Sequence, residues 1–214
     1  MKTKRPILFD LDGTLWDTRE AITESWNNTF EANGHGRPVT LENLSPLVGK
    51  TMDAFRLAYL PNMPEEPGKR FMKIVEEKEV EDLSSGCESC VYDGVIETLR
   101  DLAKDHWLGI VSNCQCGYIE DFLIASGLDD VIQAHLCYGQ TLTSKGQSIL
   151  RVIQEHNLEN ACYVGDTFGD QAAAKEAGID FIWAEYGFGT NVEKKGIQQI
   201  SDLTNDPYFV DLLK

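Results

Sequence analysis

The chain has 214 residues and a formal net charge of −16 at pH 7. An acidic surface of this kind repels DNA, RNA and anionic lipid, because those contacts depend on Lys and Arg side chains that meet phosphate. Apolar residues make up 42% of the chain, enough for the core of one or two globular domains. No apolar run approaches the ~20 residues that span a bilayer, and the basic start MKTKR leads into no secretory signal. We therefore expect a cytoplasmic protein with no membrane or nucleic-acid partner.

Five short apolar runs predict buried strands: residues 6–9, 107–112, 134–138, 161–165 and 179–184. Each run shows little alternation between apolar and polar residues, which is typical of strands that are covered on both faces. Helical patterns lie between the later runs, and alternation of strand and helix predicts a parallel sheet. The expected fold is therefore α/β, with a doubly wound and mostly parallel sheet.

The stretch from residue 17 to 90 departs from this alternation, because none of its runs predicts a strand. Its patterns predict helices over 18–33, 51–60 and 66–82, separated by glycines and prolines. A helical insert thus follows the first strand of the sheet. The sequence predicts an α/β core domain of residues 1–16 and 91–214, and an inserted helical domain of residues 17–90.

Polar and acidic residues gather at the ends of three predicted strands. Asp10 and Asp12 follow the first strand, Ser112 and Asn113 end the second, and Asp166 and Asp170 follow the fourth. In a doubly wound sheet whose first strand is central, these strands can be neighbours, and their carboxyl ends form a ligand-binding crevice. Four carboxylates in one crevice repel one another unless a cation is bound, and a set of oxygen ligands favours Mg²⁺. An Asp-x-Asp at a strand end on its own is more often a cap or a turn, but the matching strand ends favour a site.

One cation is positioned to enter this crevice. Lys145 precedes a predicted helix just after the third strand. Taken alone, it is an ordinary exposed lysine at a helix start, where the helix dipole slightly disfavours a cation. If its side chain turned into the crevice instead, the ammonium group would balance the carboxylates and hold a phosphoryl oxygen.

Six cysteines stand at positions 87, 90, 114, 116, 137 and 162. Without a secretory signal, we expect free thiols. A zinc site built from Cys87, Cys90, Cys114 and Cys116 is less favoured, because the second spacing is too tight for a CxxC knuckle and the pairs lie apart in the chain. Cys114 and Cys116 follow Asn113, so a redox-sensitive site is an alternative to simple spacer residues.

These residues resemble the haloacid dehalogenase superfamily of aspartate-nucleophile phosphatases. The matched motifs are DLDGT (10–14), VSN (111–113), Lys145 and GDTFGD (165–170), with softer matches at YDGVIETLRDL and EYGFGT (185–190). The resemblance implies a Rossmann-like core with a type 1 helical cap. Among relatives, the chain looks most like the phosphoglycolate phosphatase branch.

The resemblance also implies roles in catalysis. Asp10 would attack phosphorus and form an aspartyl-phosphate. Asp12 would protonate the leaving oxygen and then activate water, while Thr14 helps to fix Asp12. Ser112 and Asn113 would hold the phosphoryl group, and Lys145 would offset its charge.

The implied cofactor is Mg²⁺. Its ligands would come from Asp10, Asp12 (through the main-chain carbonyl), Asp166 and Asp170, although Asp170 could instead act indirectly through Lys145. In the helical cap, Lys50 within LVGKT (47–51) is the cation best placed to meet an anionic leaving group. A solvated surface lysine is an equally supported interpretation of Lys50.

We therefore expect Mg²⁺-dependent hydrolysis of a small phosphorylated metabolite, either phosphoglycolate-like or a sugar phosphate, by a monomer or homodimer. A phosphomutase similar to β-phosphoglucomutase stays open, because no residue distinguishes it. A dehalogenase is less favoured, since it needs no second acid and Asp12 is present. From a different class, a phosphoaccepting signalling domain also places acids and a lysine at sheet ends, but such modules are shorter and lack a helical insert.

Overall fold

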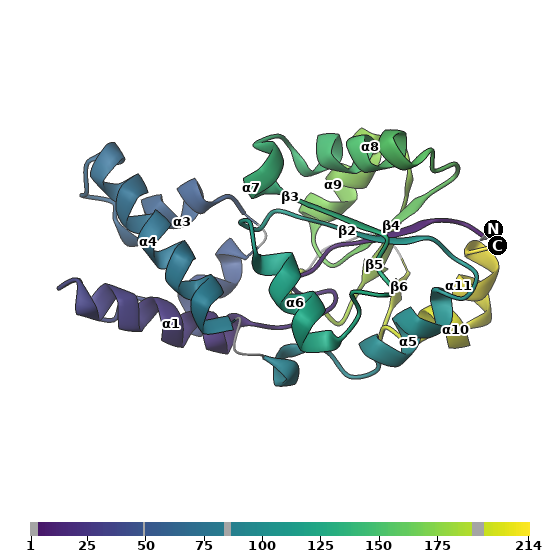
Figure 1. The fold of residues 1–214 in the computed structure, drawn as a ribbon, viewed down its shortest axis with the longest axis horizontal. Coiled ribbons are helices and arrows are strands. Elements are labelled where there is room, and N and C mark those ends of the chain that lie inside the picture. The colour runs from purple at the N-terminus through teal and green to yellow at the C-terminus, as the bar shows by residue number, and fades with distance from the viewer. Residues whose placement is uncertain (1–3, 49, 84–86, 190–194) are drawn as a thin grey trace.

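A computed structural model of the chain describes residues 4–48, 50–83, 87–189 and 195–214 (Figure 1). Its sheet has six parallel strands in the order β3-β2-β1-β4-β5-β6. The strands are β1 (Ile7–Phe9), β2 (Leu108–Ser112), β3 (Ala134–Cys137), β4 (Cys162–Gly165), β5 (Asp180–Ala184) and β6 (Gly196–Ile197). The α/β class and the five predicted strands are confirmed. The short β6 was not predicted, because two residues carry no periodicity.

The first strand is central, as expected. β1 pairs with β2 on one side and with β4 on the other, so that Phe9 lies opposite both Ile110 and Val164. The direction in which later strands are added reverses at β1, and this is the point where a doubly wound sheet opens a crevice at the carboxyl ends of its strands. The ends of β1, β2 and β4 therefore meet at one place.

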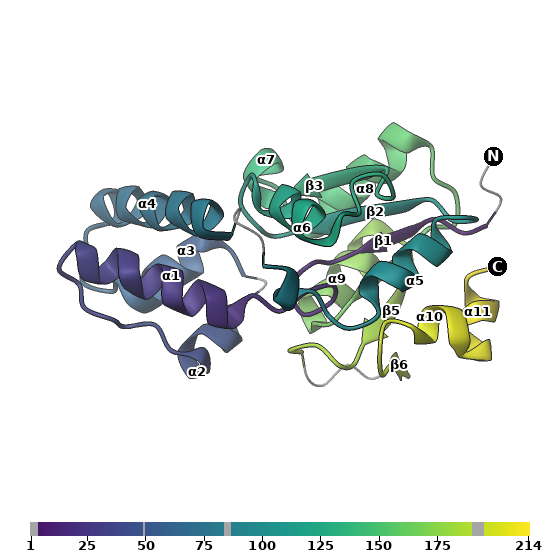
Figure 2. The ribbon, with the colours of Figure 1, turned by 60° about the horizontal axis from the view of Figure 1, so that its bottom comes forward.

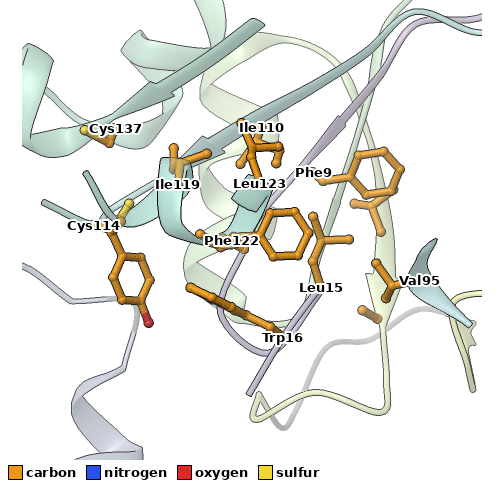
Figure 3. Packing of buried hydrophobic residues seen from close by; sticks show 14 of the residues in the cluster. Phe9, Leu15, Trp16, Val95, Ile110, Cys114, Ile119, Phe122, Leu123 and Cys137 are labelled. Atoms are coloured by element: carbon orange, nitrogen blue, oxygen red, sulfur yellow. The ribbon is translucent and has the colours of Figure 1, made fainter. Parts of the chain in front are cut away.

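Helices cover both faces of the sheet. On one face, Leu8 and Tyr163 pack with α8 (Lys145–His156) and α9 (Phe168–Ala177). On the other face lie α5 (Val95–Leu102), α6 (Tyr118–Ser126), α10 (Asp202–Asn205) and α11 (Pro207–Leu212). Figure 3 shows Phe9 and Ile110 of the sheet near Phe122, Leu15 and Trp16 in this second core. Successive residues of a strand point to opposite faces, so each strand needs apolar residues throughout.

A short helix α7 (Tyr138–Thr141) directly follows β3. Four other helices form a separate layer at one end of the molecule (Figures 1 and 2). They are α1 (Arg19–Ala32), α2 (Leu41–Leu44), α3 (Met52–Tyr59) and α4 (Glu65–Leu83). Aromatic edge-to-face pairs hold them together: the ring centroids of Trp26 and Phe55 lie 5.2 Å apart, and those of Phe30 and Phe71 lie 5.1 Å apart. The three predicted helices are confirmed, whereas the single-turn α2 was too short to be recognised. This layer is the expected helical cap.

The chain leaves the core and returns to it side by side. The N–H of Asp17 donates to the carbonyl of Cys90 (2.7 Å), and the N–H of Tyr92 donates to the carbonyl of Leu15 (3.1 Å). Between these bonds, Trp16 and Val91 form an antiparallel bridge. Both connections to the cap thus pass through one hydrogen-bonded pair of segments. Residues 84–86, within the predicted 17–90 insert, lie outside the described residues.

One pair of cysteines corrects the expectation of free thiols. Cys87 and Cys90 form a disulfide, because the 3₁₀ turn η2 (Glu88–Cys90) brings their Cα atoms to 5.2 Å, within the usual range for such a bond. Cys114, Cys116, Cys137 and Cys162 are free. Within the described ranges, no cysteine belongs to a group able to hold a metal ion, so the zinc alternative has no support.

In the described part of the chain, no helix combines the length and the apolarity that a membrane crossing requires.

Candidate active site

Three aspartates from two separate motifs meet beyond the sheet. Asp10 directly follows β1, and its N–H donates to the carbonyl of Val164 in β4 (2.8 Å). One carboxylate oxygen from each of Asp10, Asp166 and Asp170 lies within 4.8 Å of the others. All three side chains are buried, with 3%, 0% and 0% of their surface exposed. Burial and the charge of Asp170 raise the pKa of Asp10 well above its usual value.

Lys145 supplies the positive charge among these carboxylates. It is the first residue of α8, which begins after the capping side chain of Ser144. The Lys145 ammonium donates to Oδ1 of Asp10 (2.9 Å) and to Oδ1 of Asp170 (2.5 Å). Although burial opposes it, the charges of these two partners raise the pKa of Lys145 above its usual value. The crevice therefore contains a permanent cation beside Asp10.

Asp170 is fully engaged within the protein. Its Oδ1 accepts from Lys145, and its Oδ2 accepts from the N–H of Thr167 (2.9 Å) and from the Thr167 hydroxyl (2.6 Å). These bonds form a capping box at the start of α9. Of the two roles expected for Asp170, this arrangement favours the one that acts through Lys145.

Asp166 has one carboxylate oxygen that no described residue contacts by a hydrogen bond. Its Oδ2 accepts from the N–H groups of Phe188 (2.7 Å) and Gly189 (3.2 Å). Its Oδ1 is buried and has no hydrogen-bond partner among the described residues. Burial, reinforced by the charge of Asp170, raises the pKa of Asp166 to about 7. Because buried polar atoms are almost always satisfied, a lone carboxylate oxygen beside Asp10 fits a divalent cation.

The loop that holds Asp166 leaves no space for larger residues. A Cβ atom on Gly189 would lie 2.1 Å from the Asp166 carbonyl oxygen, and one on Gly187 would lie 2.3 Å from the Asp166 Cβ. In the same loop, the Tyr186 hydroxyl donates to the carbonyl of Thr14 (2.6 Å). In the sequence, the EYGFGT segment matched the family, but no role was assigned to it. Thr190 at its end lies outside the described residues. The two glycines that follow the fifth strand in this segment were the sequence feature that could have indicated a close approach between two stretches of backbone.

Asp12 is held by aromatic and hydroxyl donors that the sequence did not identify. Its Oδ1 accepts from the Tyr118 hydroxyl (2.8 Å), the Trp16 indole N–H (3.1 Å) and the Thr18 hydroxyl (3.4 Å). The predicted contact from Thr14 is not seen, since the Thr14 hydroxyl is buried without a hydrogen-bond partner among the described residues. The three donors already surround the Asp12 oxygen. Burial, opposed by the Tyr118 hydrogen bond, raises the pKa of Asp12 to about 6.

A cavity of about 50 Å³ lies between these acids and the cap. Asp10, Asp12, Ser112 and Asn113 line it from the core, so the structure places the predicted phosphoryl-binding residues beside the acids. Its cap side is mostly apolar, formed by Ile22, Trp26, Leu44, Val48, Met52 and Phe55. The exposed Lys50 also lines it, as expected for a cap residue that faces a substrate.

Glu79 of the cap is a buried acid in this cavity that sequence reasoning missed. Only 3% of its surface is exposed, and burial raises the pKa of its carboxyl to about 8. Its Oε2 accepts from the Trp26 indole, and its Oε1 accepts from the Gln115 amide of the core (2.9 Å). Glu79 lies four residues after the buried Val75, so its place on the apolar stripe of α4 was the available signal.

This set of groups suits phosphoryl transfer. It combines a buried carboxylate of the kind that can act as a nucleophile, a second carboxyl whose pKa lies near neutral, a fixed cation and a group of carboxylates that could hold a divalent ion. Reaction at phosphorus depends mainly on such positioning and electrostatic stabilisation.

Comparisons with known proteins agree with this chemistry. The family model described as haloacid dehalogenase-like hydrolase matches residues 7–184. The chain is 32% identical over 177 residues to the pyrophosphatase PpaX of Listeria monocytogenes serotype 4b (strain CLIP80459), which covers 80% of this chain and 78% of that protein. It is 30% identical over 203 residues to a phosphoglycolate phosphatase of Agrobacterium fabrum, covering 87% and 84%.

A crystal structure of a predicted phosphoglycolate phosphatase from Haemophilus somnus 129pt has the same fold, with a TM-score of 0.81 at 22% identity. The superposition covers 94% of this chain and 97% of that one. The chain therefore belongs to the haloacid dehalogenase-like hydrolase family, as a phosphatase similar to the phosphoglycolate phosphatases.

Proposed function

We propose that this phosphatase hydrolyses a small phosphomonoester through an aspartyl-phosphate on Asp10, with Mg²⁺ as its cofactor. The observation that carries the proposal is the buried Oδ1 of Asp166, which has no hydrogen-bond partner among the described residues. The Asp166 carboxylate lies close to that of Asp10, in the group of three aspartates that could hold a metal ion. A bound cation would satisfy such an atom, and a site of carboxylate oxygens suits a hard divalent ion.

Asp10, Asp166 and the main-chain carbonyl of Asp12 would hold Mg²⁺. When bound, the ion supplies positive charge that lowers the repulsion between a carboxylate nucleophile and an anionic phosphoryl group. Asp170 is not needed as a ligand, because both its oxygens already accept hydrogen bonds from Lys145 and Thr167.

The side chains of this chain perform the two steps. The Asp10 carboxylate attacks phosphorus while Lys145, Ser112 and Asn113 bind the phosphoryl oxygens. The Asp12 carboxyl gives its proton to the leaving oxygen and, once ionised, takes a proton from the water that hydrolyses the aspartyl-phosphate. A pKa near 6 for Asp12 suits both roles, because the group can be acid in one step and base in the next near neutral pH.

The cap limits the size of the substrate. A cavity of about 50 Å³ above the acids has room for one phosphoryl group and little more. We propose a short leaving group, which the Lys50 ammonium contacts if it is anionic. The two relatives are named as a pyrophosphatase and a phosphoglycolate phosphatase; both names refer to small anionic phosphate compounds and support this choice.

The test measures phosphate released from p-nitrophenyl phosphate, pyrophosphate, 2-phosphoglycolate and small sugar phosphates, with Mg²⁺ or with excess EDTA. We expect turnover of at least one small ester that EDTA abolishes and Mg²⁺ restores. The Asp10→Asn variant should lose turnover, while the exposed Asp129→Asn variant should keep it. Activity that survives in Asp10→Asn, or in excess EDTA, would contradict the proposal. A parallel sugar-phosphate isomerisation assay separates hydrolysis from a phosphomutase reaction.

A further inference from the structure

Three free cysteines come together beside the phosphoryl-binding loop, although Cys137 is distant from the others in sequence. Cys114 and Cys116 lie on the loop after β2, and Cys137 ends the neighbouring strand β3, where it pairs in register with Ser112. The loop lies directly against the segment after β3. The N–H of Gly139 donates to the carbonyl of Cys114 (3.1 Å), and a Cβ on Gly139 would lie 3.0 Å from the Cys116 sulfur.

The sulfur of Cys137 is the acceptor of this cluster. The backbone N–H of Gln140 donates to it. Hydrogen bonding from the thiols of Cys114 and Cys116 acts in the same direction, and it lowers the pKa of Cys137. The Cys114 bond is the largest of the effects that lower the pKa of Cys137, to about 6. A thiolate is the nucleophilic form of cysteine, so Cys137 is prepared to attack a sulfur atom near it.

The three thiols differ in their access to solvent. Cys116 is exposed and lines an open cavity of about 610 Å³ between α4 of the cap and the core, whereas only 2% of Cys137 is exposed. A small oxidant therefore reaches Cys116 first, and Cys137 lies behind it as the second thiol. Disulfide-forming sensor sites need an accessible cysteine beside a resolving cysteine of this kind.

We propose that Cys116 and Cys137 form a disulfide in response to peroxide and that this bond inhibits the phosphatase. The Cys116 thiolate, a minor form because burial and Cys137 raise the pKa of this thiol, reacts with hydrogen peroxide to give a sulfenic acid and hydroxide. The Cys137 thiolate then attacks the Cys116 sulfur, the S–O bond breaks, and hydroxide leaves. Two thiols are oxidised and one peroxide is reduced to two waters overall, and a dithiol reductant reverses the bond.

Inhibition follows from the position of Cys116 in the active-site loop. The amide of the adjacent Gln115 donates to Glu79 of the cap. The hydroxyl of Tyr118, two residues after Cys116, donates to Asp12. A covalent bond to Cys137 changes the position of this loop against the segment after β3, and with it the contacts of Gln115 and Tyr118. Because a misplacement of about 1 Å can cost roughly 10²-fold in rate, we expect the oxidised enzyme to lose about ten- to a hundredfold in kcat/KM. This inhibitory part depends on the proposed function, whereas the bond itself does not.

The experiment treats the purified full-length protein with hydrogen peroxide and maps its disulfides by mass spectrometry of proteolytic peptides. Turnover of the small phosphoester that the reduced protein hydrolyses fastest is measured before oxidation, after it, and after dithiothreitol. The variants are Cys116→Ser, which changes an exposed residue, and Cys137→Ser, with Cys162→Ser in β4 as the matched control. Thermal melting of the reduced proteins shows whether each variant is folded.

We expect a linked pair of peptides that contain Cys116 and Cys137, together with an activity loss that dithiothreitol reverses. Both should be absent in Cys116→Ser and unchanged in Cys162→Ser. Failure to form the link, a link between Cys114 and Cys137 in its place, or equal peroxide inhibition of Cys116→Ser would each overturn the proposal. If the reduced protein hydrolyses no phosphoester, the proposed function fails, and the peptide map still decides whether the bond forms.

Discussion

Replacing Glu79 with glutamine should change how the stability of the protein depends on pH. In the folded state, burial raises the pKa of the Glu79 carboxyl from 4.5 to about 8, although hydrogen bonds from Gln115 and Trp26 oppose the shift. The folded protein thus keeps a proton that the unfolded chain loses above pH 4.5. The stability that comes from this protonated carboxyl is fully present below the unfolded pKa and is lost as the pH rises through the folded pKa.

The size of the effect follows from the shift. Each pKa unit is worth about 1.4 kcal/mol, so the rise from 4.5 to about 8 corresponds to a stability change on the order of 4 kcal/mol between these pH values. A glutamine is neutral at every pH and nearly the same shape. The free energy of unfolding of Glu79→Gln, relative to wild type, should therefore increase by about 4 kcal/mol from pH 5 to pH 9.

Urea unfolding followed by circular dichroism at pH 5, 7 and 9 measures this difference directly. Thermal unfolding should show it as well, as a relative gain of roughly 10 °C in Tm, because about 2–4 °C accompanies each kcal/mol in a chain of this length. The matched control is Glu77→Gln, an exposed glutamate on the same helix α4, which should show no such trend. A difference between Glu79→Gln and wild type that is the same at pH 5 and pH 9 would refute the reasoning.

Three further predictions concern the metal ligand, the core and the cap. Gly189→Ala should weaken Mg²⁺ binding about 10- to 100-fold in calorimetric titration, because the new methyl displaces the backbone that orients Asp166. Gly169→Ala, whose Cβ would contact only a hydroxyl at 3.4 Å, should bind Mg²⁺ normally, and equal affinities would count against this role. Phe122→Ala should cost about 3–5 kcal/mol in urea unfolding, since the ring is fully buried, and a loss below 1 kcal/mol would contradict this. Lys50→Ala should raise KM for anionic substrates with little change in kcat, so an unchanged KM for every active substrate would exclude the predicted contact.

The part of the fold that could be predicted is the part that chain order determines. Continuous apolar runs marked five strands, and acids at their ends met because β1 has β2 and β4 as neighbours. Chain order left Lys145 open between an exposed lysine at a helix start and a cation in the crevice; the family resemblance favoured the crevice, where the structure places it. Once several strands end at one edge, the residues that follow them must come together.

The residues that were missed depend on how distant elements pack. Tyr118 and Glu79 lie on helices whose apolar pattern gives no indication of the partner that each polar group meets. The Thr14 hydroxyl was expected to hold Asp12, but the competing donors belong to residues outside the motif. The Cys87–Cys90 bond depends on a single local turn, which periodicity does not describe. These contacts between individual side chains could therefore be identified only from the structure and not from the sequence.

The paired segments at Trp16 and Val91 have a consequence for how this kind of enzyme diversifies. The two segments that lead into and out of the cap are hydrogen-bonded to each other. The cap helices therefore form a loop whose two ends are held together whatever residues lie between them. The entropic penalty of such a loop grows only with the logarithm of its length. Substrate preference can thus be rewritten by exchanging the whole inserted module, while the sheet that carries the nucleophile is inherited intact.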